Sequence, residues 1–247
     1  MIPILSVVLF FPLLGGLLLL IIPRENVKTI QRVGLAFALL TLALSIGVWV
    51  LVAQANADPA DDVRPPGENY AWIPAFSVQY HLEADGLSAP MVALVALVTV
   101  LALYYSEHTV GTRLKEYFFL LLLLETSVIG VFLARDMVLF YTFWVVCLLP
   151  MLLLISVWGG EERERAAVKF FLYNLLGSVA LLLVLLVVFA QVETFDMQEA
   201  AQKGPYGNDE YFTNACIALC ALFFAFIVRL PSFPFHTWLS DAQSESP

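Results

Sequence analysis

Two ionisable residues lie inside apolar runs of the sequence, where a charge is costly. Glu125 follows five consecutive leucines and precedes two hydroxyl residues, and Arg229 follows the apolar run 225–228. Ionisable groups inside a bilayer cost roughly 3 kcal/mol each on insertion scales and indicate an ion pathway by default. Glu125 is therefore a candidate proton carrier, with a carboxyl locked in a static contact between helices as the alternative. Arg229 keeps its proton at physiological pH, so it sets the local field, pairs with an acid or reaches the membrane surface.

Two prolines follow Arg229 closely. Pro231 and Pro234 should break the helix and leave carbonyls that side chains or water must satisfy. A charge beside a broken helix is a known arrangement for an ion site in a membrane. His236 lies beyond the break, where its imidazole could relay protons or pack in a hydrogen bond. Lys169 begins another apolar stretch and suits an interfacial anchor better than a proton carrier.

The sequence contains no motif for nucleotide, flavin, zinc or iron–sulfur binding. GxxxxGK[ST], GxGxxG after a strand, HExxH and CxxC are all missing. Three cysteines fall inside apolar runs, where a thiol behaves as a small buried hydrophobe. We expect no redox chemistry, bound cofactor, metal site or nucleic-acid partner for this chain alone.

These residues must be positioned by membrane helices. Of the 247 residues, 61% are apolar and 13% are charged, against about 25% charged in an ordinary soluble domain. A bilayer core needs about 20 apolar residues per helix, and backbone groups in lipid must bond internally. The sequence predicts an all-α polytopic membrane protein that forms a single domain over 1–247. About seven spans are expected, at 2–22, 33–52, 87–105, 117–133, 137–158, 166–190 and 212–230. We interpret the first span as a retained helix and not as a signal peptide.

Charge along the chain indicates topology. Eight Lys and Arg residues lie in one set of alternating loops, and the opposite set holds three, namely Arg64, Arg135 and Lys203. The positive-inside rule then places the N-terminus outside. The acidic outer loop 56–85 contains Pro65-Pro66-Gly67 and the alternating run 75–82. This pattern predicts a short strand or hairpin, with an ordinary connector as the alternative.

Six segments in the second half share the pattern of a known family. They are DMVLFYTFW at 136–144, PM at 150–151, WGG at 158–160, AAVKFFLY at 166–173, GS at 177–178 and PSFPFHTWLSDA at 231–242. In this order they resemble the antiporter-like chain M of respiratory complex I, the NADH:quinone oxidoreductase. The sequence DGLS at 85–88, Glu245 and Pro247 fit the same pattern. The resemblance runs from about residue 83 to the end, whereas the first two helices fit only by hydropathy and topology.

The resemblance implies a proton-translocating membrane-arm subunit of about fourteen helices, built from inverted repeats. It also implies partner subunits that hold quinone, FMN and iron–sulfur clusters, and an energy-transducing membrane such as the bacterial inner membrane with its lipids. In that family a glutamate of the fifth helix and a lysine of the seventh form the proton-carrying pair. Here Val145 stands at the carboxylate position and Arg229 at the lysine position, and Gln243 replaces a family histidine.

The sequence ends where the family's eighth helix would begin. The C-terminal antiporter half is therefore expected to come from a second polypeptide or to be missing from a reduced scaffold. Three hypotheses follow. The chain conducts protons through Glu125, paired with Arg229 directly or through water; it is a structural subunit without its own proton path; or it belongs to a multisubunit cation/proton antiporter. In the first two, it is a subunit of a proton-translocating oxidoreductase that performs no redox chemistry itself.

Overall fold

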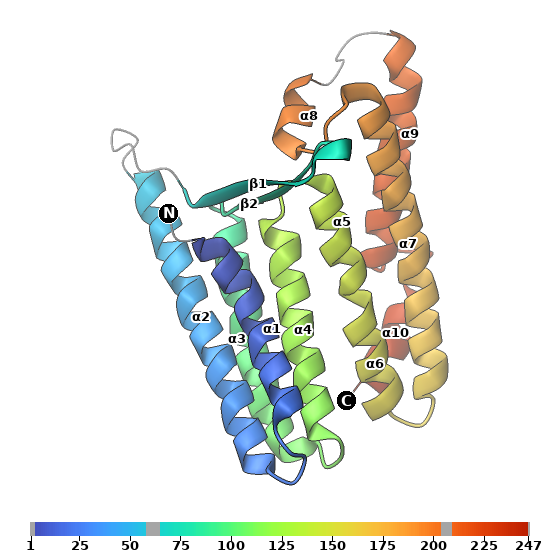
Figure 1. Cartoon of the computed structure of the whole chain (residues 1–247). Coiled ribbons are helices and arrows are strands. Elements are labelled where there is room, and N and C mark those ends of the chain that lie inside the picture. The colour runs from blue at the N-terminus through green and yellow to red at the C-terminus, as the bar shows by residue number, and fades with distance from the viewer. Residues whose placement is uncertain (1–2, 58–64, 204–208, 247) are drawn as a thin grey trace. The chain divides into compact units, whose positions relative to one another are not determined.

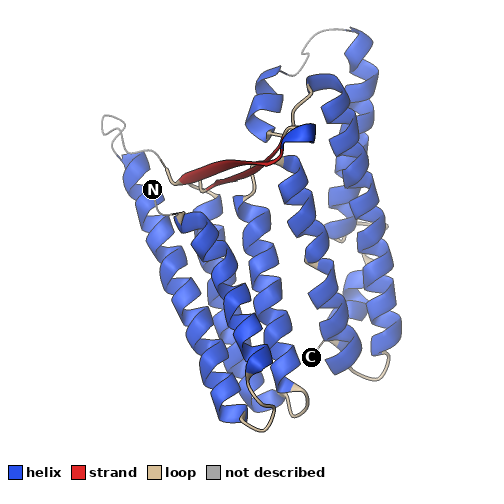
Figure 2. Cartoon of the chain, viewed as in Figure 1, coloured by secondary structure: helices blue, strands red, loops and turns tan. Residues whose placement is uncertain are grey.

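A computed structural model describes residues 3–57, 65–203 and 209–246 of the chain (Figure 1). The described residues are mostly helical, with one two-stranded sheet (Figure 2). The chain divides into two compact units. The first comprises Met1–Asn69 and His81–Ala134, and the second comprises Tyr70–Tyr80 and Arg135–Pro247.

Seven segments are long and apolar enough to cross a membrane, as the sequence predicts. The first unit holds four of them, and the second holds three, of which the first consists of two helices. Their helices are α1 (Ile4–Ile21), α2 (Val27–Ala57), α3 (Ser88–Thr109), α4 (Leu114–Leu133), α5 (Met137–Val146) with α6 (Leu148–Trp158), α7 (Arg163–Val192) and α9 (Asp209–Arg229). The polytopic all-α class is thereby confirmed, while the orientation in the membrane stays a prediction.

Small residues let the helices of the first unit approach closely. A Cβ placed on Gly15 would lie 2.7 Å from Cβ of Phe37, and one on Gly34 would lie 2.6 Å from a ring carbon of Phe118. Glycine is common at such interfaces in membranes because close packing, not water exclusion, holds the helices together. Large apolar side chains on the outer faces of α1, α2 and α3 are exposed, as expected for a surface against lipid.

The loop between α2 and α3 forms a hairpin. Strand β1 (Gly67–Ile73) pairs with β2 (Val78–Glu83), and a short 3₁₀ turn, Pro74–Phe76, connects them. Glu68, one of the outer-loop acids, is buried and accepts hydrogen bonds from the first turn of α1. The acids Asp58, Asp61 and Asp62 and the basic Arg64 of this loop lie outside the described residues.

In the second unit α7 packs against α5, α6, α9 and the short helix α10 (Thr237–Glu245). Helix α8 (Met197–Lys203) follows α7. Asp136 caps α5 by accepting from the N–H groups of Val138 and Leu139, and its other oxygen accepts from the Gln79 N–H of the hairpin tip. A buried carboxylate with three donors fixes the start of α5.

Candidate functional site

Glu125 is buried inside the first unit. Its side chain is 1% exposed, and among the residues that the structure describes neither carboxylate oxygen has a hydrogen-bond partner. The adjacent hydroxyls do not help, because Thr126 and Ser127 donate to carbonyls of their own helix, those of Leu122 and Leu123. An isolated buried carboxylate is too costly to keep its charge. Glu125 must therefore hold a proton or a cation.

Arg229 occupies the last position of α9 in the second unit. Its guanidinium carbon lies 4.0 Å from the centroid of the Trp144 ring, and Nη1 donates to the Trp144 carbonyl oxygen at 3.3 Å. Trp144 is 5% exposed. Within the described part of the chain no carboxylate lies at ion-pair distance from Arg229. The charge is thus held by a cation–π contact and a carbonyl, interactions that need no change of protonation.

The fifth span passes beside this contact and is weakened there. Helices α5 and α6 together cover the predicted stretch, 137–158, which is long and apolar enough to cross a membrane as one segment. At Cys147, between the two helices, the backbone stays helical and the N–H keeps its helical hydrogen bond. Pro150 has no N–H to offer the carbonyl of Val146, four residues earlier, so one helical hydrogen bond is missing at this point. Val145, at the family's carboxylate position, lies one residue before the carbonyl that lacks its helical donor.

Glu125 and Arg229 belong to different units. Neither forms an ion pair within its own unit among the described residues, so their pairing stays a prediction. The structure does bring Lys169 to a partner, since Nζ lies 2.8 Å from Oδ2 of Asp241 in α10. The hydrogen bond from Lys169 lowers the pKa of the Asp241 carboxyl below its ordinary value. Lys169 therefore ties two helices of the second unit together.

Other contacts also hold α10 in place. The Trp238 indole N–H donates to the Val228 carbonyl at 2.9 Å, and its ring meets that of Phe170 edge-on. The carbonyl of Glu245 accepts from the Gly160 N–H, and its Oε2 accepts from the Glu162 N–H. The short helix is thereby fixed at both of its ends.

The segment between α9 and α10 contains the predicted break. Helix α9 ends at Arg229 and α10 begins at Thr237, with Pro231 and Pro234 between them. The interpretation of these helices as one broken span stays a prediction. His236 is exposed, directly precedes α10 and has its ring 5.9 Å from that of Phe233. Its role as a proton relay stays a prediction.

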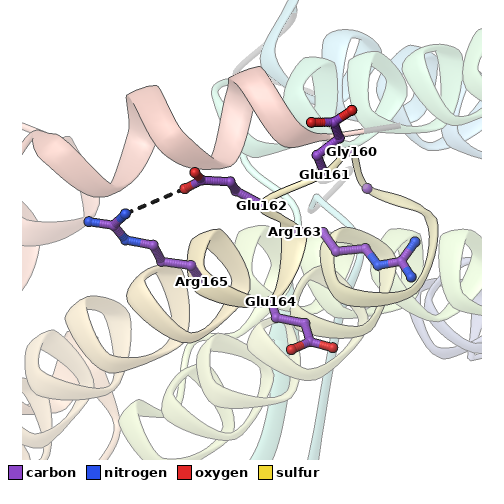
Figure 3. Close-up of a pocket in the computed structure, with 7 residues that line it drawn as sticks. Gly160, Glu161, Glu162, Arg163, Glu164 and Arg165 are labelled. Carbon is purple, nitrogen blue, oxygen red and sulfur yellow. Dashed lines mark hydrogen bonds and ion pairs between the residues drawn. The ribbon is translucent and has the colours of Figure 1, made fainter.

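A surface hollow of about 930 Å³ lies at the turn between α6 and α7. Figure 3 shows its charged side chains, with Arg163 and Glu164 pointing in different directions and Arg165 joined to Glu162. This ion pair spans 3.4 Å between side chains that are 81% and 69% exposed, so water and salt screen it. No group of three or more His, Cys, Asp or Glu close enough to hold a metal occurs in the described ranges.

Comparison with known proteins shows what the chain is similar to. The family described as "NADH:quinone oxidoreductase/Mrp antiporter, TM" matches residues 134–247. The chain is 36% identical to NADH-quinone oxidoreductase subunit M of Rickettsia felis, over 99% of this chain and 49% of the relative. The resemblance to the antiporter-like subunit M is confirmed. The match extends through the first two helices, which fit the pattern in the sequence only by hydropathy and topology.

Further similar proteins are related subunits of quinone oxidoreductases and of a complex with the same fold. NAD(P)H-quinone oxidoreductase chain 4 of the Chlorokybus atmophyticus chloroplast is 37% identical over 99% of this chain and 46% of its own length. Respiratory complex I from Thermus thermophilus with bound NADH contains a chain of the same fold, with a TM-score of 0.81, 26% identity and coverage of 98% of this chain and 47% of that one. The Mrp complex from Dietzia sp. shares the fold at 22% identity and a TM-score of 0.79.

The chain spans about half the length of the curated relatives it matches. Its seven apolar helices and the match of residues 134–247 to a transmembrane family model show that it is an integral membrane protein. Sequence reasoning missed three polar groups that the structure singles out, namely Ser45, Glu68 and Asp136. Serine in an apolar run is too common to be a signal, but Asp136 directly before an apolar stretch carries the pattern of a helix cap.

Proposed function

We propose that the chain is an antiporter-like module in the membrane arm of an NADH:quinone oxidoreductase and supports proton translocation coupled to electron transfer. Its partners are other membrane-arm subunits, including a polypeptide with the remaining antiporter helices. Quinone, FMN and iron–sulfur clusters belong to partner chains, and the assembly lies in a bacterial inner membrane or an equivalent energy-transducing membrane. The likeness to subunit M over 99% of the chain supports this assignment.

The buried carboxyl of Glu125 carries the proposal for this chain's own part. A carboxyl that is 1% exposed and has no hydrogen-bond partner in the described part of the chain can change its protonation without breaking an ion pair there. Arg229 cannot play this part, because a guanidinium keeps its proton. Glu125 is accordingly the proton-holding group of the module, and Arg229 supplies a fixed positive field.

The test is the proton-to-electron ratio of the purified assembly in proteoliposomes. Glu125→Gln keeps the size of the side chain and removes its titration, so we expect normal electron transfer with a reduced proton ratio. Glu116→Gln is the matched control, because Glu116 lies on the same helix and pairs at its end with Arg24 at 2.7 Å. An unchanged ratio in an assembled Glu125→Gln variant would falsify the assignment.

A second candidate function is a structural subunit that seals and positions its neighbours. The contact between Arg229 and Trp144 favours it, because the fixed charge is satisfied without a carboxylate, and Val145 offers none. Val145→Glu combined with Arg229→Lys tests this candidate. A structural subunit gains no proton transfer from the pair, whereas a rise in the proton ratio would show that a path exists and needs only its carrier.

A third class, the multisubunit cation/proton antiporter, shares the fold, as the Dietzia complex illustrates. It is distinguished by transport without an electron donor. Exchange of sodium for protons across vesicles in the absence of NADH would favour it, and its absence favours the oxidoreductase arm.

A further inference from the structure

A second buried polar group lies in the first unit without a partner. Ser45 of α2 is 0% exposed, and within the described chain its hydroxyl makes no hydrogen bond. Other buried hydroxyls of this unit donate to their own helices, as Thr41 does to Phe37 and Thr99 to Val95. Ser45 and Glu125 are thus two buried groups whose oxygens are left free to bind something else.

Close contacts between α2 and α4 place these two groups near one level of the four-helix unit. Gly34 of α2 packs on Phe118 of α4, and the two helices run in the same direction (Figure 1). Two turns further along each helix lie Thr41 and Glu125, and Ser45 follows one turn later. With a rise of about 1.5 Å per residue, Ser45 and Glu125 are about one turn apart along the axis.

Helix α1 contributes a third oxygen at this level. Pro12 lies inside α1 and has no N–H, so the carbonyl of Val8 lacks its usual helical donor. Helix α1 runs against α4, and Gly16 packs on Leu122, which puts Pro12 opposite Thr126. Gly15 packs on Phe37 of α2, which puts Val8 beside Ser45. A carbonyl without its usual helical donor, and a hydroxyl and a carboxylate without hydrogen-bond partners among the described residues, thus come from three helices.

We propose that this polar layer, defined by Glu125, Ser45 and the Val8 carbonyl, binds one small monovalent cation, either sodium or a hydrated proton. One carboxylate neutralises one positive charge, and the spans 4–21, 33–54 and 88–106 contain no other charged residue. Hard cations take carboxylate, hydroxyl and carbonyl oxygens as ligands. A carbonyl freed by an interrupted helix is a known source of such a ligand in membranes.

The layer deepens the proposed function, on which it rests for the role of Glu125. It adds that the ion is held within α1, α2 and α4 of the first unit. Neither Arg229 nor the weakened helix at Pro150 takes part in holding it. The proposed function needs only that Glu125 titrates. The layer needs in addition that Ser45 and the Val8 carbonyl share its ion.

Labelling of Glu125 with dicyclohexylcarbodiimide, which reacts with protonated carboxyls in apolar surroundings, tests the layer in the purified assembly. The modified residue is quantified by mass spectrometry with and without sodium chloride, against choline chloride. Protection by sodium identifies a sodium site, for which Ser45→Ala and Pro12→Ala should each raise the protecting concentration about five- to tenfold. If the labelling of Glu125 is the same with and without sodium, the layer is a proton site. In that case both variants should change the labelling rate at fixed pH several-fold.

Pro12→Ala restores the missing N–H and with it a helical hydrogen bond, so this variant should not destabilise α1. A change in labelling in Pro12→Ala is therefore not explained by misfolding. Ser106→Ala is the control, since Ser106 is a buried serine of the same unit that donates to Ala102 and lies away from this level. Wild-type labelling and sodium response in both Ser45→Ala and Pro12→Ala overturn the layer. If Glu125→Gln still lowers the proton ratio, the proposed function survives that result.

Discussion

In this chain a titratable charge and a fixed charge lie on two separate residues, although one ion pair could contain both. Glu125 can change its charge and has no hydrogen-bond partner among the residues that the structure describes, whereas Arg229 has a fixed charge held by the face and carbonyl of Trp144. Because a guanidinium bound in this way cannot return a proton, its contribution is electrostatic and structural. The strength of its contact with Trp144 therefore decides how rigid that charge is.

A double-mutant cycle measures the strength of this contact. Trp144→Leu and Arg229→Gln should each destabilise the solubilised protein, and their coupling energy should reach about 1–2 kcal/mol because the contact is largely removed from water. Denaturant unfolding in detergent gives the differences in unfolding free energy between the wild type and the two single variants and the double variant. The exposed pair Arg165 and Glu162 serves as the control and should show coupling close to zero. Additive effects at Trp144 and Arg229 would mean that the ring does not hold the charge.

Charged residues of the site could be predicted from the sequence, whereas the neutral ones could not. Glu125 and Arg229 are conspicuous because a charge in an apolar run is rare and costly. Ser45 is not conspicuous, because hydroxyls in membrane helices commonly donate to their own backbone, as Thr41 does. Only the register between helices shows which hydroxyl is left free and which carbonyl lies beside it.

At the scale of elements, side chains from distant segments complete the ends of helices. The first N–H groups of α1 have no partner in their own helix, and its first turn has no side-chain cap of its own. Glu68 of β1 supplies one, accepting from the N–H groups of Leu5 at 2.6 Å and Ser6 at 3.1 Å and from the Ser6 hydroxyl. A carboxylate at this end also suits the helix dipole.

Glu68→Ala should therefore destabilise the start of α1 by about 1–2 kcal/mol, the usual cost of losing a cap. Hydrogen exchange at the amides of Leu5 and Ser6 should accelerate, while amides in the middle of α1 stay protected. Glu68→Gln keeps an acceptor without the charge, so its effect should be smaller. Equal exchange in the alanine variant and the wild type would show that water replaces the cap at no cost.

The docking of α10 should depend on pH through Asp241. Its pKa is lowered in the folded protein by Lys169, so the ion pair stabilises the docked helix above the ordinary pKa of Asp, about 3.9, and this stabilisation is lost as pH falls through the lowered value. Proteolysis between Arg229 and Thr237 should therefore accelerate only below about pH 4. Asp241→Asn should remove this pH dependence. A proteolysis rate of the wild type that does not change with pH would contradict the prediction.

The lengths of the helices follow from hydropathy, but the contacts that fix their ends do not. Each span was predicted because about 20 apolar residues are needed to cross the bilayer. The predicted stretch 137–158 is one candidate span, and Pro150 marks the one place where its helical hydrogen bonding is weakened. The ends of α1 and α5 depend on Glu68 and on the Gln79 contact of Asp136, which are set by tertiary structure.

On the scale of the whole molecule, the surface of α9 indicates a missing neighbour. Only 11% of the apolar window of α9 is buried within the described structure, against 56% for α4. Lipid can cover apolar side chains such as Phe223 and Leu219, but it is a poor neighbour for the charge of Arg229 at the end of the same helix. A protein partner that offers polar groups beside Arg229 and apolar groups beside the rest of α9 satisfies both requirements.

Affinity purification of this chain from gently solubilised membranes should accordingly recover other membrane-arm subunits, together with subunits of the quinone site and the hydrophilic arm. Cross-linking from a photoreactive residue at Phe223 should capture a protein neighbour, because Phe223 is 65% exposed on α9. A residue of the same kind at Leu101, 58% exposed on α3 of the other unit, is the control for general proximity. Only lipid adducts at Phe223 would show that α9 faces the bilayer and has no protein neighbour there.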